Sequence, residues 1–256
     1  MQKEYIPLLE EAKEECKNHF KEKLLAFYLH GSIAFNDAVP YISDLDSYIV
    51  ISGEPTAGDK EFYGRTEGKL QEKYPIINGV HLNIHSREEL KEDCFARFIL
   101  RYNSVLYYGG DIVKALEENG AKRMLPNLET AKGRLSFARQ CFSDAIDGKR
   151  PANTGSVPEN VYYAARKFAR YFVIIEGAYF LMAENRFVSF EKETVLNELR
   201  NIAPEFKNIS DITEKILQDP IEAMIPAEEY LKIIKPLVEY MFDTIFKLKR
   251  LRNFSG

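Results

Sequence analysis

The chain has 256 residues, of which 45% are hydrophobic and 29% charged, and its formal net charge is −4 at pH 7. These values are typical of an ordinary globular protein and count against nucleic acid as the main partner, because nucleic-acid binders usually present a basic face. The three cysteines are widely spaced and form no CxxC pair, which argues against a disulfide framework and a zinc site.

The first residues are charged and amphipathic, unlike a signal peptide, and no apolar run reaches the ~18 residues that a membrane span needs. We therefore expect a cytoplasmic protein without a membrane partner.

The first half of the chain mixes helical and strand patterns. Periodic or alternating apolar residues predict helices over 4–23, 60–73 and 87–103 and strands over 24–29, 45–52 and 79–84. A short helix or turn is expected over 33–39, and a turn is expected over 105–108 and 109–111.

The second half changes in character, with long helical patterns over 129–147, 161–184, 191–202 and 230–251 and no clear strand. The sequence thus predicts two domains. The first, over residues 1–127, is an α/β (α+β) domain with a small mixed sheet and flanking helices. The second, over residues 128–256, is an all-α helical bundle.

The most informative stretch is His30-Gly31-Ser32 followed by Ser43-Asp44-Leu45-Asp46. Residues i and i+2 of a strand point to the same face, so Asp44 and Asp46 can direct both carboxylates at one point. Oxygen ligands are what Mg²⁺ prefers, usually completed by substrate phosphates and water. The aspartate pair therefore predicts a magnesium site.

The turn before it suits a phosphate. Gly31 lets the backbone approach a ligand closely, and Ser32 can offer its N–H and hydroxyl to phosphate oxygens. A short helix starting there would present further N–H donors. Facing a Mg²⁺ site, this arrangement favours transfer of a nucleotidyl group with pyrophosphate leaving. Ser43, beside the pair, is expected to buttress it and to belong to the cofactor-binding set.

Together these residues resemble the polymerase-β-like nucleotidyltransferase superfamily, most closely the aminoglycoside adenylyltransferases of the streptomycin/spectinomycin type. The signature is Gly31-Ser32 and Asp44-x-Asp46, with eleven residues between Ser32 and Asp44. The resemblance is specific over about residues 24–52, weak over 60–111 and only architectural beyond. It implies ATP as co-substrate, Mg²⁺, antibiotic resistance, and transfer of AMP to a hydroxyl of a small polar molecule bound between the two domains.

The chain departs from the family where a later strand usually carries a third carboxylate, as metal ligand or as general base. The matching strand here has His81 and Asn83 at its site-facing positions. Imidazole suits proton transfer at neutral pH, so we expect His81 to act as the base, and Asn83 can offer a carbonyl oxygen to Mg²⁺. A shifted strand register would instead bring in Glu88 or Glu89.

In relatives the helical half closes over the nucleotide and supplies basic side chains. Residues 185–192 fall where relatives often have a Gly-x-x-x-Ser-Lys segment, which suggests that Arg186 or Lys192 reaches a phosphate. An arginine of the preceding helix in the streptomycin enzymes corresponds to Gly177 here. Arg97 and Arg101, one helical turn apart, fit a solvated helix face as well as a phosphate site.

Two other functions compete with the adenylyltransferase. The missing third carboxylate suits a nucleotide-binding sensor or regulator that has lost its chemistry. The acceptor could also be a protein or an RNA, although the acidic balance counts modestly against RNA. The sequence leaves the acceptor, the nucleotide preference and the oligomeric state open.

Overall fold

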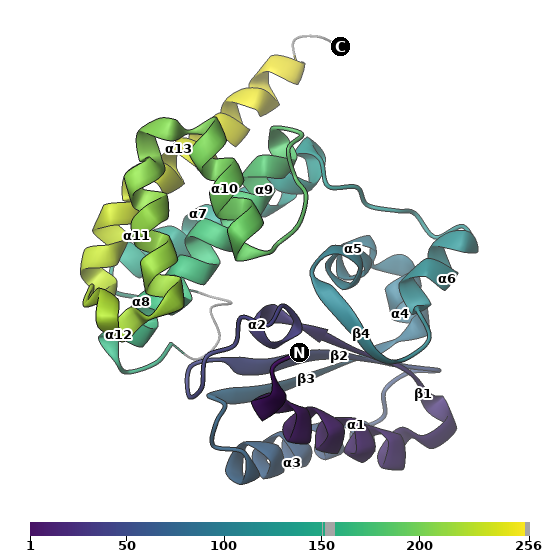
Figure 1. Ribbon diagram of the computed structural model, residues 1–256. Coiled ribbons are helices and arrows are strands. Elements are labelled where there is room, and N and C mark those ends of the chain that lie inside the picture. The colour runs from purple at the N-terminus through teal and green to yellow at the C-terminus, as the bar shows by residue number, and fades with distance from the viewer. Residues whose placement is uncertain (150, 152–156, 254–256) are drawn as a thin grey trace. The chain divides into compact units, whose positions relative to one another are not determined.

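The computed structural model of the protein describes residues 1–149, 151 and 157–253 (Figure 1). The chain divides into two compact units, Met1–Met124 and Leu125–Gly256. The predicted division into functional domains at residue 127 stays a prediction. None of the described helices combines the length and the apolar character that crossing a membrane requires.

A four-stranded mixed sheet forms the centre of the first unit, with strand order β3-β2-β1-β4. Its strands are β1 (Leu24–His30), β2 (Asp44–Ile51), β3 (Gly79–Ser86) and β4 (Ser104–Gly109). Strand β2 runs antiparallel to β1 and parallel to β3, and β4 runs antiparallel to β1. The prediction of a mixed α/β chain with a small mixed sheet is confirmed.

Helices α1 (Ile6–Phe20) and α3 (Ala57–Lys73) cover one face of this sheet (Figure 1). They close the larger core over the strand residues Phe27, Leu29, Leu45, Ile49 and Leu82. These strand positions alternate with the polar ones, so this face is apolar and the opposite face of β2 is free to carry carboxylates.

The opposite face has a smaller core, formed with helices α4 (Arg87–Glu92), α5 (Cys94–Tyr102) and α6 (Ile112–Glu118). Its strand residues are Ala26, Tyr28 and Val50. Val50 lies near the end of β2, whereas Asp44 and Asp46 lie at its beginning. The apolar packing of this face therefore sits at one end of the strand and the acidic pair at the other.

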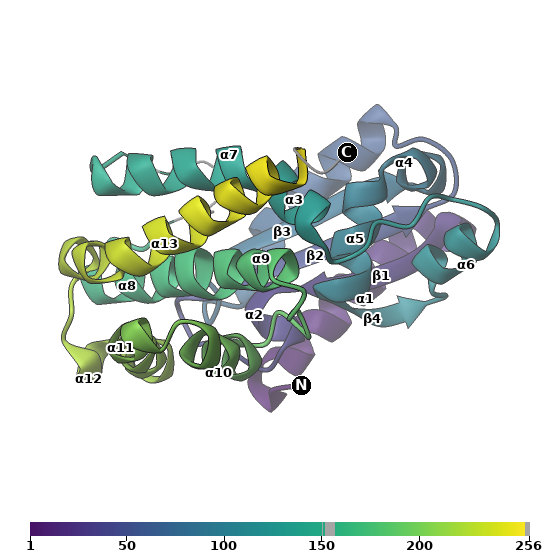
Figure 2. The ribbon, with the colours of Figure 1, turned by 90° about the horizontal axis from the view of Figure 1, so that it is seen from above.

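The second unit is helical, with no strand among its described residues, as predicted. Its elements are α7 (Leu128–Ile146), α8 (Val161–Phe168), a π-helical segment (Ala169–Ile175), α9 (Glu176–Ala183), α10 (Lys192–Ile202), α11 (Lys207–Gln218), α12 (Pro220–Ala223) and α13 (Ala227–Asn253). Helices α7, α9 and α13 pack against one another (Figure 2). Helix α11 was not predicted from the sequence.

Two predictions in the first unit are wrong. The single helix predicted over 87–103 is broken at Asp93, whose Oδ1 accepts hydrogen bonds of 2.9 Å from the N–H groups of Phe95 and Ala96. This cap ends one helix and starts the next. Residues 105–108 belong to β4 instead of forming a turn, because they pair with β1. A side chain at Gly109 would collide with the Leu25 carbonyl oxygen.

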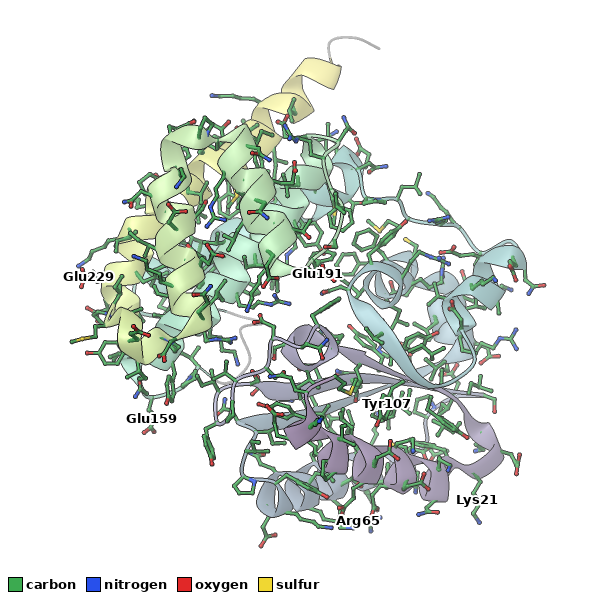
Figure 3. The ribbon with its side chains drawn as sticks, viewed as in Figure 1. Lys21, Arg65, Tyr107, Glu159, Glu191 and Glu229 are labelled. Carbon is green, nitrogen blue, oxygen red and sulfur yellow. The ribbon has the colours of Figure 1, made fainter. Side chains whose placement is uncertain are left out.

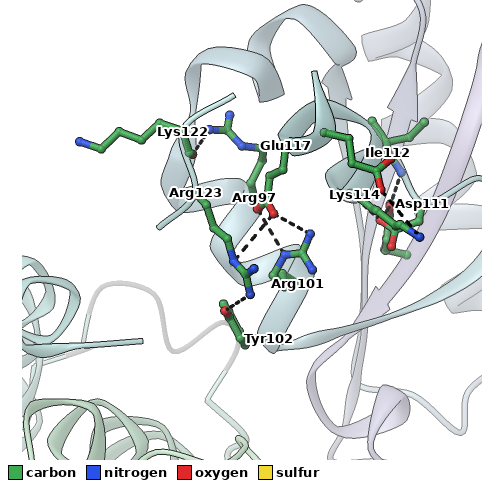
Figure 4. Close-up of polar contacts among 11 residues, drawn as sticks. Arg97, Arg101, Tyr102, Asp111, Ile112, Lys114, Glu117, Lys122 and Arg123 are labelled. Carbon is green, nitrogen blue, oxygen red and sulfur yellow. Dashed lines mark hydrogen bonds and ion pairs between the residues drawn. The ribbon is translucent and has the colours of Figure 1, made fainter. Parts of the chain in front are cut away.

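Arg97 and Arg101 form neither a solvated face nor a phosphate site. Arg97 is 2% exposed and donates hydrogen bonds to the backbone carbonyl oxygens of Leu90, Lys91 and Lys122. Arg101 pairs with Glu117 at 2.8 Å (Figure 4). Both arginines are thus used to hold the α4–α6 region together.

The start of α3 gives a stability prediction that depends on pH. Burial raises the pKa of Asp59, but hydrogen bonds from the Thr56 N–H and hydroxyl and from His19 outweigh it and leave the pKa below its usual value. A lowered folded pKa means that the stabilisation is complete above the unfolded pKa of about 3.9 and is lost as pH falls through the folded value.

We expect Asp59→Asn to lower the unfolding free energy at pH 7 by about 1 kcal/mol, the size of a helix-cap contribution. The difference from the wild type should shrink as pH falls through the lowered pKa of Asp59, because the folded state then gains the proton as well. Urea unfolding at pH 7 and at a series of lower pH values measures this difference in unfolding free energy. Glu61→Gln, at an exposed position of the same helix, is the control. A difference that does not change with pH would contradict the assignment.

Candidate functional site

The Gly-Ser turn and the aspartate pair meet where β1 ends and β2 begins. The antiparallel register pairs His30 with Asp46, so Gly31, the first residue of α2 (Gly31–Ala34), follows directly beside Asp46. Gly31 has φ +73°, and a Cβ there would lie only 2.8 Å from Asp46 Oδ2. Glycine is therefore favoured by the left-handed backbone conformation, and a larger residue would also have to displace the Asp46 carboxylate.

Asp44 and Asp46 are half-buried and lie on the same face of β2, as predicted. Asp44 Oδ1 accepts a hydrogen bond of 3.3 Å from Asn78 Nδ2. Further along this face, burial raises the pKa of Tyr48, and the charges of Asp46 and Asp93 raise it further. The field of the Asp46 carboxylate thus extends along the partly buried face of the sheet.

Strand β3 brings His81 to the pair. The parallel register sets Gly79 beside Asp44 and His81 beside Asp46. A Cβ at Gly79 would lie 3.3 Å from Asp44 Oδ1 and 3.4 Å from His81 Nε2, so both atoms border the space left by the missing side chain. His81 Nε2 is buried and has no hydrogen-bond partner within the described chain. Its hydrogen-bonding capacity is therefore not used by the part of the chain that the structure describes.

The other candidates on β3 are engaged differently. Asn83 lies one pleat further along, beside Tyr48, and its Nδ2 donates to the Ser47 carbonyl oxygen at 3.1 Å. Glu88 and Glu89 lie in the first turn of α4 instead of on the strand. The register shift that would bring either acid to the aspartates does not occur.

The two serines differ in their surroundings. Ser32 is half-buried in α2, where its carbonyl oxygen accepts a hydrogen bond of 2.9 Å from the Asp37 N–H. Ser43 is 6% exposed, and its Oγ accepts a hydrogen bond of 2.9 Å from the Val39 N–H. The contacts of Ser43 are those of a residue that buttresses the loop before β2.

The predicted phosphate-binding cations belong to the second unit. Arg186 Nε donates to Glu198 Oε2 at 2.9 Å. Lys192 begins α10, next to the N-cap residue Glu191 that is labelled in Figure 3, and its Nζ lies 3.9 Å from Glu193 Oε1. The role of Arg186 and Lys192 in the site stays a prediction.

The acidic residues fit a metal ion that is shared with a ligand. Across the part of the chain that the structure describes, no group of three His, Cys, Asp or Glu side chains converges closely enough to hold an ion. Mg²⁺, however, is commonly bound through one or two carboxylates completed by substrate phosphates and water. Asp44 and Asp46, next to a glycine turn that can approach a phosphate, provide what such an ion needs from the protein.

Comparison with known proteins bears on the fold. No family model matches the sequence, and no curated protein is similar to it in sequence. Among solved structures, the chain resembles spectinomycin adenyltransferase AAD(9) from Enterococcus faecialis, determined with ATP and spectinomycin. The TM-score is 0.50 at 15% identity, over 93% of this chain and 98% of that one. The protein therefore has a fold related to that of a nucleotidyltransferase.

The two reasons for glycine at position 31 can be tested together. Gly31→Ala should lower the unfolding free energy by at least about 1–2 kcal/mol, the cost of the left-handed conformation alone. Gly64→Ala is the matched control: Gly64 lies within α3 with nothing near its missing Cβ, so alanine should stabilise the protein by about 0.5–1 kcal/mol. Equal effects of the two changes, measured by urea unfolding, would contradict the described turn.

Proposed function

We propose that the protein is an Mg²⁺-dependent nucleotidyltransferase that transfers AMP from ATP to a hydroxyl of a small polar molecule and releases pyrophosphate. The observation that carries the proposal is the shared face of Asp44 and Asp46 beside the Gly31 turn. The fold likeness to an adenyltransferase determined with ATP and spectinomycin supports it and favours an aminoglycoside-like acceptor.

In this proposal the Gly31-Ser32 turn binds the phosphates of the nucleotide. The absence of a side chain at Gly31 allows close approach, and Ser32 offers its N–H and hydroxyl. Asp44 and Asp46 hold Mg²⁺, which when bound neutralises charge that develops on the phosphates. Ser43 keeps the loop before β2 in place.

His81 takes the place of the third carboxylate as the general base. Its buried Nε2, without a partner among the described residues, is one strand away from Asp46 and can accept the proton of the acceptor hydroxyl. We assign His81 this role and not that of a third metal ligand, because Asp44, Asp46 and His81 form no three-residue metal cluster among the described residues. Asn83 supplies a further oxygen on the same face.

A nucleotide-binding sensor is the second candidate. It is favoured by one observation: the strand position opposite Asp46 holds a histidine where the resemblance predicts a carboxylate. Such a protein would bind the nucleotide through the same turn and aspartates but would not turn it over.

The metal assignment is tested by Asp46→Asn. The variant should reduce the rate of pyrophosphate release from ATP by at least about 10³-fold, because one of two carboxylates for the ion is lost. Circular dichroism and urea unfolding should show an intact fold. Glu61→Gln, which changes an exposed acid of α3 outside the proposed site, is the control. Wild-type turnover in Asp46→Asn would show that the metal assignment is wrong.

The base assignment is tested by His81→Ala. We expect kcat to fall by about 10²–10⁴-fold, the usual contribution of a general base, with the Kd for Mg²⁺–ATP unchanged. His85→Ala is the matched control, since His85 lies further along the same strand face and its Nδ1 is 3.3 Å from Glu89. Nucleotide binding by the wild type without turnover of any acceptor would instead favour the sensor.

A further inference from the structure

The loop that joins the Gly-Ser turn to the aspartate pair is held in an unusual conformation. Two of its residues, Asn36 and Tyr41, have positive φ values of 56° and 65°. Such conformations are unfavourable for residues other than glycine, above all for an aromatic one, and persist only where the surroundings hold them. The loop therefore depends on contacts with other parts of the chain.

A side chain from the beginning of the chain supplies two of these contacts. Gln2 Nε2 donates to the Ala38 carbonyl oxygen at 2.9 Å, and the Ala38 N–H donates to Gln2 Oε1 at 2.9 Å. Ala38 is 4% exposed, so both of its backbone polar groups are satisfied where water has little access. The side-chain amide of Gln2 thus forms with Ala38 the same pair of hydrogen bonds that a neighbouring strand would form.

Gln2 is itself fixed. Its carbonyl oxygen accepts a hydrogen bond of 3.3 Å from the N–H of Tyr5, a residue that is fully buried in the core of the first unit. The amide clamp therefore connects the core under the sheet to the loop between Ser32 and Asp44. Ser43 and Ile76 hold the far end of the same loop, through the Val39 N–H and the Tyr41 N–H.

We propose that Gln2 is a positioning residue for nucleotide binding: its amide keeps the 35–43 loop in the conformation that sets the Gly31-Ser32 turn against Asp44 and Asp46. This inference rests on the proposed function. Without the clamp, the loop samples other conformations, and the nucleotide binds only the fraction of molecules in which the loop is correctly placed. Affinity then falls, whereas the saturated complex retains its geometry.

The experiment compares Gln2→Met with the wild type. Methionine keeps the length and volume of the side chain but can form neither hydrogen bond. KM for ATP, and Kd for Mg²⁺ with a non-hydrolysable ATP analogue, should rise about tenfold. We expect kcat to change less than twofold and amide hydrogen exchange over residues 36–43 to accelerate.

Gln2→Glu retains an acceptor for the Ala38 N–H, but its ionised carboxylate places an oxygen that repels the Ala38 carbonyl oxygen, so its KM should rise at least as much as that of Gln2→Met. Gln140→Met removes an exposed glutamine that bonds Asp144 in α7 and should change neither KM nor exchange in the loop.

Three results would overturn the proposal. Faster exchange of the loop with unchanged KM would show that the clamp is only structural. Equal losses of kcat in Gln2→Met and Gln2→Glu with unchanged KM would show that the loop does not limit binding. Absence of nucleotide binding by the wild type would overturn the proposed function as well, which distinguishes that failure from the first two.

Discussion

The site depends on the register of β2 between its two neighbours. Pairing with β1 sets Asp46 next to the end of that strand and to Gly31, while pairing with β3 sets Asp44 next to Gly79. At each glycine the position of the missing Cβ is bordered by a carboxylate oxygen. The lack of a side chain at Gly31 and Gly79 thus leaves room for the two carboxylates at this end of the sheet.

The hydrophobic core enforces this register. Because strand side chains alternate, Leu45, which lies between the two aspartates, and Ile49 fall on the face that α1 and α3 cover. A slip by one residue would turn Asp44 and Asp46 into that core and expose the leucine and isoleucine. Burial of the apolar face thus holds the carboxylates on the other face, so that the packing energy of the unit maintains the geometry of the site.

The sequence predicts the features that depend on residues close together in the chain. The spacing of Asp44 and Asp46 determines that they share a face, and the alternation over 79–84 predicts that His81 faces the same way, which the register with β2 confirms. Features that depend on tertiary contact were not predictable. The break at Asp93 comes from a side-chain cap within an apolar periodic segment, and β4 is a strand only because β1 is beside it.

The same limit applies to the site. The burial of Ser43 and the clamp from Gln2 to Ala38 arise from contacts across the fold, and the sequence pattern around either residue gives no sign of them. Arg186 and Lys192 rest on a family resemblance in the second unit and stay predictions. The proposed function therefore depends mainly on residues around β1, β2 and β3, where the sequence pattern and the observed strand register agree.

The most direct measurement is a crystal structure of the protein with Mg²⁺ and a non-hydrolysable ATP analogue. Our account predicts that the triphosphate lies against the Gly31-Ser32 turn, with Mg²⁺ bound by Asp44 and Asp46 and His81 Nε2 facing the α-phosphate from the acceptor side. A nucleotide bound away from this turn, or phosphates bound there with no ion on the two aspartates, would contradict it.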